Sequence, residues 1–276
     1  MGITRIIVIS FLALAGFLQL AAAQAPPPPG DAQVMEVEAS KLLAEANDSR
    51  REQGVGLLRW DRALAAAALK HCMRMAAERQ IAHQFAGEPD PAERAGEAGA
   101  KFSVAEENVA WASNPGSIHQ GWMQSPEHRA NLLSPRVDRV GIAVVLSRGH
   151  YYAVADYSRA VPALGQSEVE ARIGAMVRAK GVAIKGDASD ARAACAMEQG
   201  LPKSLSGLEP HFVIRWQDTE LASLPKALVD RLRSGDYKQA AVGSCPTTRA
   251  TGPFTAYRLA VLLYGPPSTN DVNPFY

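Results

Sequence analysis

The stretch Gly121-Trp-Met-Gln-Ser-Pro-Glu-His-Arg-Ala-Asn-Leu132 decides the local structure in the first half of this chain. Ser125 followed by Pro126 is typical of a helix N-cap with proline at the first helical position. His128 is therefore expected in the first turn of the helix that follows. A shorter helix that carries Trp122 is expected directly before it.

The flanking sequence predicts helices before this stretch and a hairpin after it. Two runs rich in β-branched and aromatic residues, 139–146 and 151–157, lie on either side of a short turn segment and predict an antiparallel hairpin. Apolar residues recur at helical spacing over 37–51, and Asp61 can cap a second helix. The stretch 82–104 is rich in Gly, Pro and charge, which predicts an irregular excursion that forms one wall of a cleft. This order of elements indicates an α+β fold.

A second, small α+β domain of unknown role is expected over residues 165–265, and residues 266–276 are expected to be a loose tail. The features that predict its elements are helix N-caps, glycines that end helices, and apolar residues that alternate as in a strand. The expected elements are a helix beginning at the capping box Ser167-Glu-Val-Glu170, a helix over 189–200, a strand over 212–216, a helix over 224–233 and a strand over 254–264.

The first 23 residues have the pattern of a secretory signal peptide. Arg5 precedes an uncharged apolar run over 6–20, and three alanines end the segment at Ala23. Cleavage there leaves a proline-rich linker over 24–35 and no transmembrane span. An uncleaved membrane anchor is the alternative. Either outcome places the folded protein outside the cytoplasm, as a secreted or periplasmic protein.

The composition excludes several classes of protein and partner. The 276 residues include 29 Lys and Arg against 28 Asp and Glu, and 47% are hydrophobic, which is an ordinary globular composition. No cluster of basic residues is present, so a nucleic acid is not an expected partner. Only three cysteines are present. A disulfide between Cys195 and Cys245 would leave Cys72, which is expected to be a buried thiol in an alanine-rich helix.

Several ordered motifs resemble the bacterial branch of the CAP (or SCP) superfamily, which comprises cysteine-rich secretory proteins, antigen 5 and pathogenesis-related proteins. The resemblance covers roughly residues 37–158 and implies an α-β-α sandwich with a large central cleft in a domain over 36–160. The motifs are Leu42-Leu-Ala-Glu-Ala-Asn47, Leu58-Arg-Trp-Asp61, Ala82-His83, Glu107-Asn108-Val-Ala110 and the stretch from Gly121 to Leu132.

The resemblance also implies a cleft floor built from two histidines and one or two acidic residues. Motif matching assigns these roles to His83, His128 and Glu107. Two imidazoles suit zinc or another divalent metal, and Glu107 would ligate the ion or orient a bound water. Further residues expected to line the cleft are Glu106, Asn108, Trp111 and Ser125. Glu106 replaces the family's usual glycine and either adds a carboxylate near the cleft or faces solvent, and Ser125 stands where eukaryotic members carry a second glutamate.

Two functions fit these residues, and the sequence leaves open whether the protein is an enzyme. The first is an extracytoplasmic protein that binds a small molecule, a lipid, a cell-envelope polymer or a protein partner in the cleft, with or without a divalent metal. The alternative is a metal-dependent hydrolase of cell-envelope or extracellular polymers, in which Glu107 accepts a proton from metal-bound water. Ser125 with His128 is a further catalytic hypothesis. The same residues could also form an inert polar network.

Overall fold

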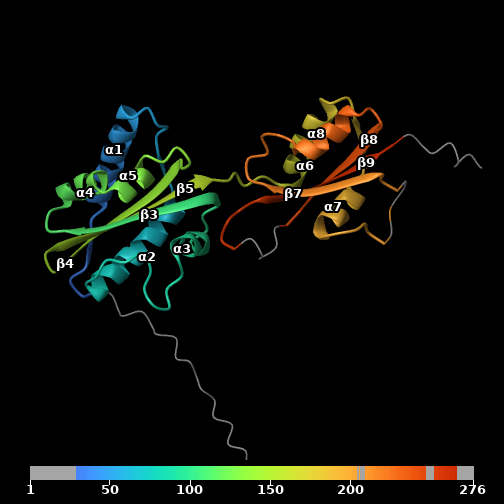
Figure 1. Cartoon of the computed structure of the whole chain (residues 1–276). Helices are drawn as coiled ribbons and strands as arrows, with labels where there is room; N and C mark the ends of the chain where they lie inside the picture. Colours follow the sequence, from blue (N-terminus) through green and yellow to red (C-terminus); the bar gives the residue numbers. More distant parts are fainter. Residues whose placement is uncertain (1–28, 204, 206–208, 247–251, 266–276) are drawn as a thin grey trace, which may run out of the picture.

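The computed structural model describes residues 29–203, 205, 209–246 and 252–265. The predicted signal peptide and the predicted tail lie outside the described residues. Figure 1 shows two folded regions, each built on its own β-sheet. We call them the N-terminal region, residues 29–160, and the C-terminal region, residues 165–265. No helix among the described residues is long and apolar enough to cross a membrane.

The N-terminal region contains a five-stranded sheet in the order β1-β4-β5-β3, with β2 pairing in parallel on the outer side of β4. The predicted hairpin is confirmed as β4 and β5, and its turn places Arg148 and Gly149 at positive φ, as tight hairpin turns require. Among the described strands, β3 pairs with β5 alone and forms one edge of the sheet. The strands are β1 (Gln33–Val34), β2 (Arg59–Trp60), β3 (Phe102–Ala112), β4 (Arg139–Ser147) and β5 (His150–Ala160).

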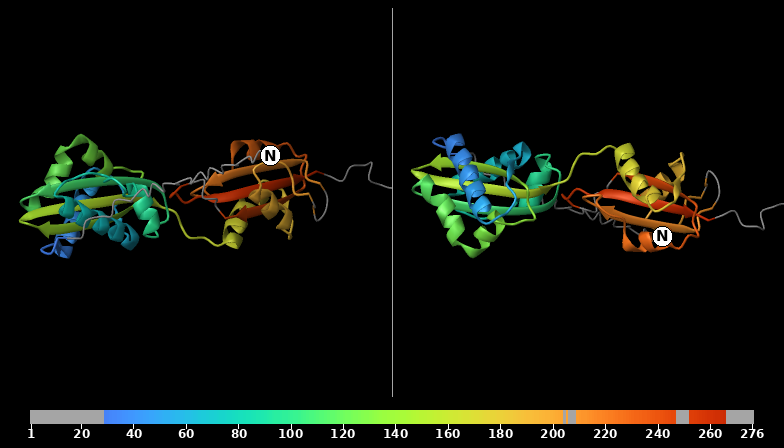
Figure 2. Two further views of the ribbon diagram at one scale, coloured as in Figure 1. Left: turned by 90° about the horizontal axis from the view of Figure 1, so that it is seen from below. Right: turned by 90° about the horizontal axis from the view of Figure 1, so that it is seen from above.

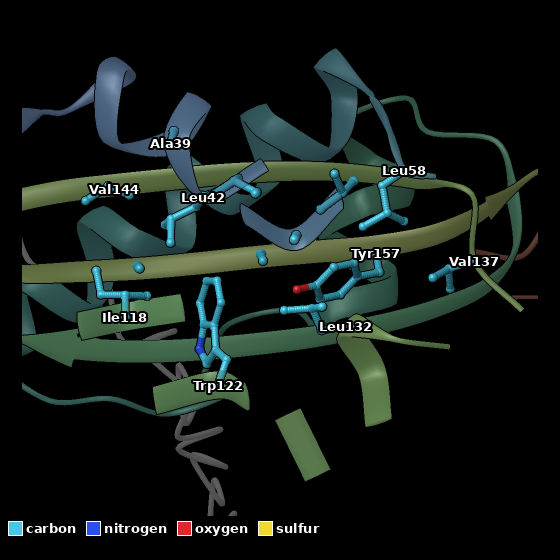
Figure 3. Packing of buried hydrophobic residues seen from close by; sticks show 14 residues of the cluster. Ala39, Leu42, Leu58, Ile118, Trp122, Leu132, Val137, Val144 and Tyr157 are labelled. Carbon is cyan, nitrogen blue, oxygen red and sulfur yellow. The ribbon is translucent and has the colours of Figure 1, made fainter. Parts of the chain in front are cut away.

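Helices cover both faces of this sheet and make the predicted α-β-α sandwich (Figure 2). One buried cluster joins the sheet to the helices on the first face, and Figure 3 shows Trp122, Tyr157 and Leu42 within it. The Trp122 indole also donates a hydrogen bond to the carbonyl of Val109, at 3.2 Å. The first face carries α1 (Glu36–Glu52), α4 (Ile118–Gln124) and α5 (Pro126–Leu132), and the second carries α2 (Arg62–Glu78) and α3 (Pro91–Glu97).

A buried arginine on α1 forms hydrogen bonds with three segments that lie apart in the sequence. Arg50 is 1% exposed, and its guanidinium donates to the carbonyl oxygens of Gly56, Leu132, Ser134 and Val137 at 2.6–3.2 Å. These acceptors satisfy a charge that would otherwise be costly to bury. The loop after α1, the end of α5 and the segment before β4 are thereby held together.

The segment over 82–104 is more ordered than the expected irregular excursion. It contains α3, whose N-terminus is a capping box between Asp90 and Glu93 with Pro91 at the first helical position. It also contains the start of β3, which the sequence analysis did not predict. Two consecutive glutamates and an asparagine interrupt the alternation of apolar residues in β3, because this edge strand borders a polar cleft.

The C-terminal region is a four-stranded sheet in the order β6-β8-β9-β7, with helices on both faces. The predicted disulfide is confirmed and joins Cys195 in α7 to Cys245 at the end of β8. The elements are α6 (Gln166–Arg178), β6 (Ala183–Ile184), α7 (Ser189–Ala196), β7 (Phe212–Asp218), α8 (Lys226–Arg233), β8 (Gln239–Cys245) and β9 (Tyr257–Tyr264).

Two details of this region differ from expectation. Helix α6 begins before the expected capping box, because the Glu168 carboxylate accepts the N–H of Gly165, whereas Glu170 pairs with Arg192 of α7 at 2.7–2.8 Å. Strand β8 was not predicted. Its sequence is short and alanine-rich and lacks the large β-branched residues that identify a strand.

Cys72 is the buried thiol that the sequence predicts. It is fully buried in α2, and its Sγ lies 3.1 Å from the carbonyl oxygen of Tyr152. Burial raises the pKa of this thiol, which keeps it protonated and unreactive.

Gly141 of β4 lies where the backbone of α2 packs closely on the sheet. A Cβ at this position would lie 2.0 Å from the backbone nitrogen of Ala65 and 2.2 Å from the carbonyl carbon of Leu64. Because both atoms belong to helix backbone, no side-chain rotation can relieve the overlap. We expect Gly141→Ala to lower the free energy of unfolding by about 3 kcal/mol or more, measured by denaturant titration. Gly121→Ala, where a Cβ meets nothing within 4 Å, is the matched control and should not destabilise. Equal effects of the two substitutions would contradict the packing described here.

Candidate functional site

Three residues that the sequence predicts at a common site line one cleft of about 410 Å³ along the outer edge of β3. His83 comes from the loop between α2 and α3, Glu107 from the middle of β3, and His128 from the first turn of α5. The lining residues are His83, Asp90, Pro91, Ala92, Ala105, Glu106, Glu107, Glu127, His128 and Asn131.

Glu107 is the buried centre of the site. Its Oε1 lies 2.7 Å from Nδ1 of His83, and its Oε2 accepts a short hydrogen bond from Nη2 of Arg94. The Glu107 residue is only 6% exposed, and each of its carboxylate oxygens bonds a protein group. The hydrogen bond with Glu107 raises the pKa of His83, and partial burial opposes this shift. With Nδ1 donating to Glu107, the second ring nitrogen of His83 is left for other partners.

Arg94 holds the loop of the first histidine as well as the glutamate. Its Nη1 donates to the carbonyl oxygens of His83 and Pro89, both at 3.0 Å. The arginine side chain is 1% exposed. Sequence reasoning missed Arg94 because nothing in its local pattern indicates burial. The capping box that starts α3 was the available signal, since it predicts the helix on which Arg94 lies.

His128 is held by a bridge of two asparagines between α5 and β3. The Asn108 amide donates to the His128 carbonyl at 2.9 Å, and the Asn131 amide donates to Asn108 Oδ1 and to the Glu107 carbonyl at 3.0–3.1 Å. Burial, and secondly the charge of His83, lower the pKa of His128. The second histidine of the cleft therefore favours its neutral form, in which one ring nitrogen carries a free lone pair.

Glu106 takes the first of its two expected alternatives. It lines the cleft, its side chain is 8% exposed, and its Oε1 accepts hydrogen bonds from Arg136 and Ser134. Solvent exposure is therefore the wrong alternative for this carboxylate. Arg136 balances its charge at the rim of the cleft.

Three residues that were expected to line the cleft are not among its lining residues. Asn108 is completely buried and braces α5 from behind. Trp111 is 52% exposed and packs on His150, with ring centroids 4.6 Å apart. Ser125 is the N-cap of α5, as its sequence predicts, although its side chain makes no capping hydrogen bond. The predictions failed because nearness in sequence to the Glu107 and His128 motifs does not determine which side of an element a residue occupies.

Two buried groups behind the cleft were missed by the sequence analysis. Asp156 of β5 lies opposite Glu107 in the sheet register, is 3% exposed, and has no hydrogen-bond partner for either carboxylate oxygen among the described residues. Burial, followed by the charge of Glu107, raises its pKa well above the usual range. His71 of α2 is fully buried and joins Glu88 at 2.8 Å and the Ala82 carbonyl at 2.7 Å. The available signal for Asp156 was an acid in the middle of β5, between the buried residues Ala155 and Tyr157.

The side chains that line the cleft determine which ligands it could offer to a metal ion. No three His, Cys, Asp or Glu side chains in the described part of the chain form a group that could hold a metal ion. Both oxygens of Glu107 accept hydrogen bonds from protein groups. The cleft lining also presents the two imidazoles and the carboxylates of Asp90, Glu106 and Glu127. A histidine whose other nitrogen bonds a carboxylate is the usual arrangement around a protein-bound metal. The two histidines would supply two nitrogen ligands to a divalent metal, one fewer than the three protein ligands of a typical catalytic zinc site.

Comparison with known proteins gives one family. The family model described as "CAP: Cysteine-rich secretory protein family" matches residues 43–157. An uncharacterized protein, YkwD of Bacillus subtilis, is 28% identical over 108 residues, which is 39% of this chain and 42% of that protein. The chain thus matches less than half the length of that curated relative.

Similar solved structures include two bacterial proteins. An outer surface protein from Borrelia burgdorferi is 18% identical, with a TM-score of 0.44, and the match covers 46% of this chain and 98% of that one. An extracellular protein containing an SCP domain from Bacillus anthracis is 24% identical, with a TM-score of 0.42, over 45% of this chain and 41% of that one.

Asp156 provides a test of the electrostatics behind the cleft. Its pKa is higher in the folded protein than in the unfolded chain, where it is about 3.9, so the folded state holds the proton more tightly. As pH rises above the unfolded value, the free energy of unfolding must fall until Asp156 itself ionises. Asp156→Asn removes this dependence. We expect the stability of the variant relative to wild type to increase with pH, by at most about 1.4 kcal/mol per pH unit.

The measurement is denaturant unfolding of both proteins between pH 4 and pH 8. Asp138→Asn, at a half-exposed carboxylate paired with Arg139, is a control for the loss of one negative charge. A stability difference between Asp156→Asn and wild type that does not change with pH would show that Asp156 is ionised at the same pH in both states.

Proposed function

We propose that this chain, whose residues 43–157 match the family model described as the cysteine-rich secretory protein family, binds a ligand or partner in the cleft beside β3, with a divalent metal such as zinc held by His83 and His128. The observation that carries this proposal is the hydrogen bond between Glu107 and Nδ1 of His83. It fixes the ring and leaves Nε2 as the donor available for a metal.

The two histidines have complementary roles in this proposal. His83 is oriented by Glu107 and its side chain is 56% exposed, so an incoming ion can reach it. The pKa of His128 is lowered, so its ring favours the neutral form that binds a metal, and fewer protons must be released on binding. A bound divalent metal would supply a Lewis-acid centre with open positions for an oxygen of the ligand.

The contacts of Glu107 support binding rather than hydrolysis. A metal-dependent hydrolase needs a general base that can take a proton from the attacking water. Each oxygen of Glu107 already accepts a hydrogen bond from the protein, Oε1 from His83 and Oε2 from Arg94, which leaves fewer lone pairs for a water molecule. We therefore rank the hydrolase second. Turnover of an ester or amide by the zinc-loaded protein, lost in Glu107→Gln, would reverse this ranking.

We also propose that the protein acts outside the cytoplasm. The Cys195–Cys245 disulfide supports this location, because such bonds persist in oxidising compartments. The predicted signal peptide agrees with it. Ligands in that compartment include small molecules, lipids, cell-envelope polymers and other proteins, and the cleft itself does not select among them.

Zinc titration of the metal-free protein tests the proposed site. We expect binding at one site in wild type and loss of that binding in His83→Ala and in His128→Ala. Glu107→Gln should weaken zinc binding by about 10–100-fold, because it alters the group that orients His83. The measurement is isothermal titration calorimetry, with circular dichroism to confirm folding.

His150→Ala is the matched control, since His150 lies at the β4–β5 turn beside Trp111 and is not among the residues that line the cleft. Its zinc affinity should equal that of wild type. Absence of zinc binding by wild type, or equal loss in the His150 variant, would refute the metal site.

The pH dependence of zinc affinity is a separate expectation. The hydrogen bond with Glu107 raises the pKa of His83, so protons compete with zinc at this residue. Affinity should therefore rise with pH until it passes the pKa of His83, by up to about tenfold per pH unit for one displaced proton. In Glu107→Gln the rise should occur at lower pH. Titrations at several pH values would show it, and an affinity independent of pH would contradict a role for His83.

A further inference from the structure

A short segment of the C-terminal region lies on the N-terminal region. Residues Pro253–Tyr257, which we call the strap, lead into and begin β9. In Figure 2 this end of β9 points towards the N-terminal region. The strap is therefore continuous in sequence with the sheet of the C-terminal region, but it contacts the N-terminal region.

The strap makes three contacts at one place. The backbone N–H of Thr255 donates to the carbonyl of Phe102 at 2.7 Å. The Phe254 ring meets the Phe102 ring edge to face, with centroids 5.5 Å apart and an interplanar angle of 76°. Pro253 covers Gly96, where an added Cβ would lie 3.1 Å from the proline Cβ. A hydrogen bond, an aromatic pair and close backbone packing together define a specific interface.

These contacts fall on the two elements that hold the centre of the cleft. Gly96 lies on α3, two residues after Arg94, and Phe102 is the first residue of β3, which carries Glu107. Phe102 is completely buried in a small cluster with Leu64 and Ala95. The strap thus packs on the junction between the helix of Arg94 and the strand of Glu107.

Helix α3 needs support from its neighbours. It has seven residues, and an isolated helix of this length is unstable in water. Arg94 can hold Glu107 and the His83 carbonyl only while α3 keeps its position. On one side α3 packs on Leu64 and Phe102 through Ala95, and the strap covers it at Gly96.

We propose that Pro253 and Phe254 are positioning residues of the cleft, through which the C-terminal region holds α3 and Arg94 in place. This inference gives the C-terminal region a role in the site itself. One more contact joins the regions, the ion pair between Arg159 and Glu220 at 3.2 Å, and the Tyr257 hydroxyl donates to the Pro162 carbonyl in the segment between the regions. The proposal rests on the proposed function only in treating the cleft as the functional site, and its test requires no metal.

The experiment compares Phe254→Ala with wild type in the full-length chain after removal of any signal peptide. Hydrogen exchange is followed at the α3 amides, and the ring nitrogen resonances of His83 are recorded by NMR at fixed pH. We expect the α3 amides of Phe254→Ala to exchange at least about tenfold faster, because local opening of the helix becomes easier. The His83 ring resonances should also move, because they report the bond between Nδ1 and Glu107. Phe254→Leu, which restores apolar contact with Phe102, should recover most of both effects.

Two further variants keep the test decisive. Glu220→Ala breaks the exposed ion pair between the regions and should leave both readouts as in wild type. Pro253→Ala removes the contact with Gly96 while Phe254 remains, and should act in the same direction as Phe254→Ala. Protection of the β7 amides shows whether the C-terminal region is folded. If Phe254→Ala unfolds that region, Pro253→Ala decides the question.

Unchanged α3 exchange or unchanged His83 resonances in a folded strap variant would overturn the proposal. A failure of zinc to bind wild type would remove the proposed metal site but would not alter these readouts. The two proposals can therefore fail separately.

Discussion

The buried ion pair between Arg94 and Glu107 is the interaction on which the site depends. Both side chains are at most 2% exposed, and burial of charges so far from water is costly unless they are paired and hydrogen-bonded. The remaining bonds of Arg94 reach the carbonyls of His83 and Pro89, and the other oxygen of Glu107 reaches His83. One guanidinium thus links a loop, a helix and an edge strand. Loss of either partner would leave a buried charge unpaired, at a cost of about 3–5 kcal/mol.

The same arrangement supports our proposal that the cleft binds a ligand. Glu107 is occupied on both sides and acts on the ring of His83, while His128 lies on a separate helix and favours its neutral form. Two imidazoles therefore line a polar cleft, and the Glu107 carboxylate between the loop and the strand is engaged by His83 and Arg94. This arrangement is the reason that we propose binding of a metal and a ligand ahead of repeated proton transfer.

The C-terminal region contributes to the same arrangement in our proposal. Its disulfide joins α7 to the end of β8, which precedes the strap along the chain, and the strap packs where α3 and β3 meet. Asp156 and His71 add buried polar groups behind the cleft, in contact with the strand and loop that carry its residues. Support for the site therefore comes from segments distributed over most of the described chain.

The sequence alone indicated the resemblance to the CAP superfamily, the main helices, the hairpin, the disulfide pair and the three residues that meet in the cleft. These features depend on local caps, periodicity and ordered motifs, which can be read without knowledge of distant contacts. The sequence did not reveal β3, Arg94 or Asp156, and it placed Trp111 and Asn108 at the cleft wrongly. Strand β3 borders the cleft and carries polar residues that break the apolar alternation, while burial and pairing of Arg94 and Asp156 arise from segments distant in the chain. Only the tertiary structure decides these properties, because the free energy of a charged side chain depends on which groups surround it in space.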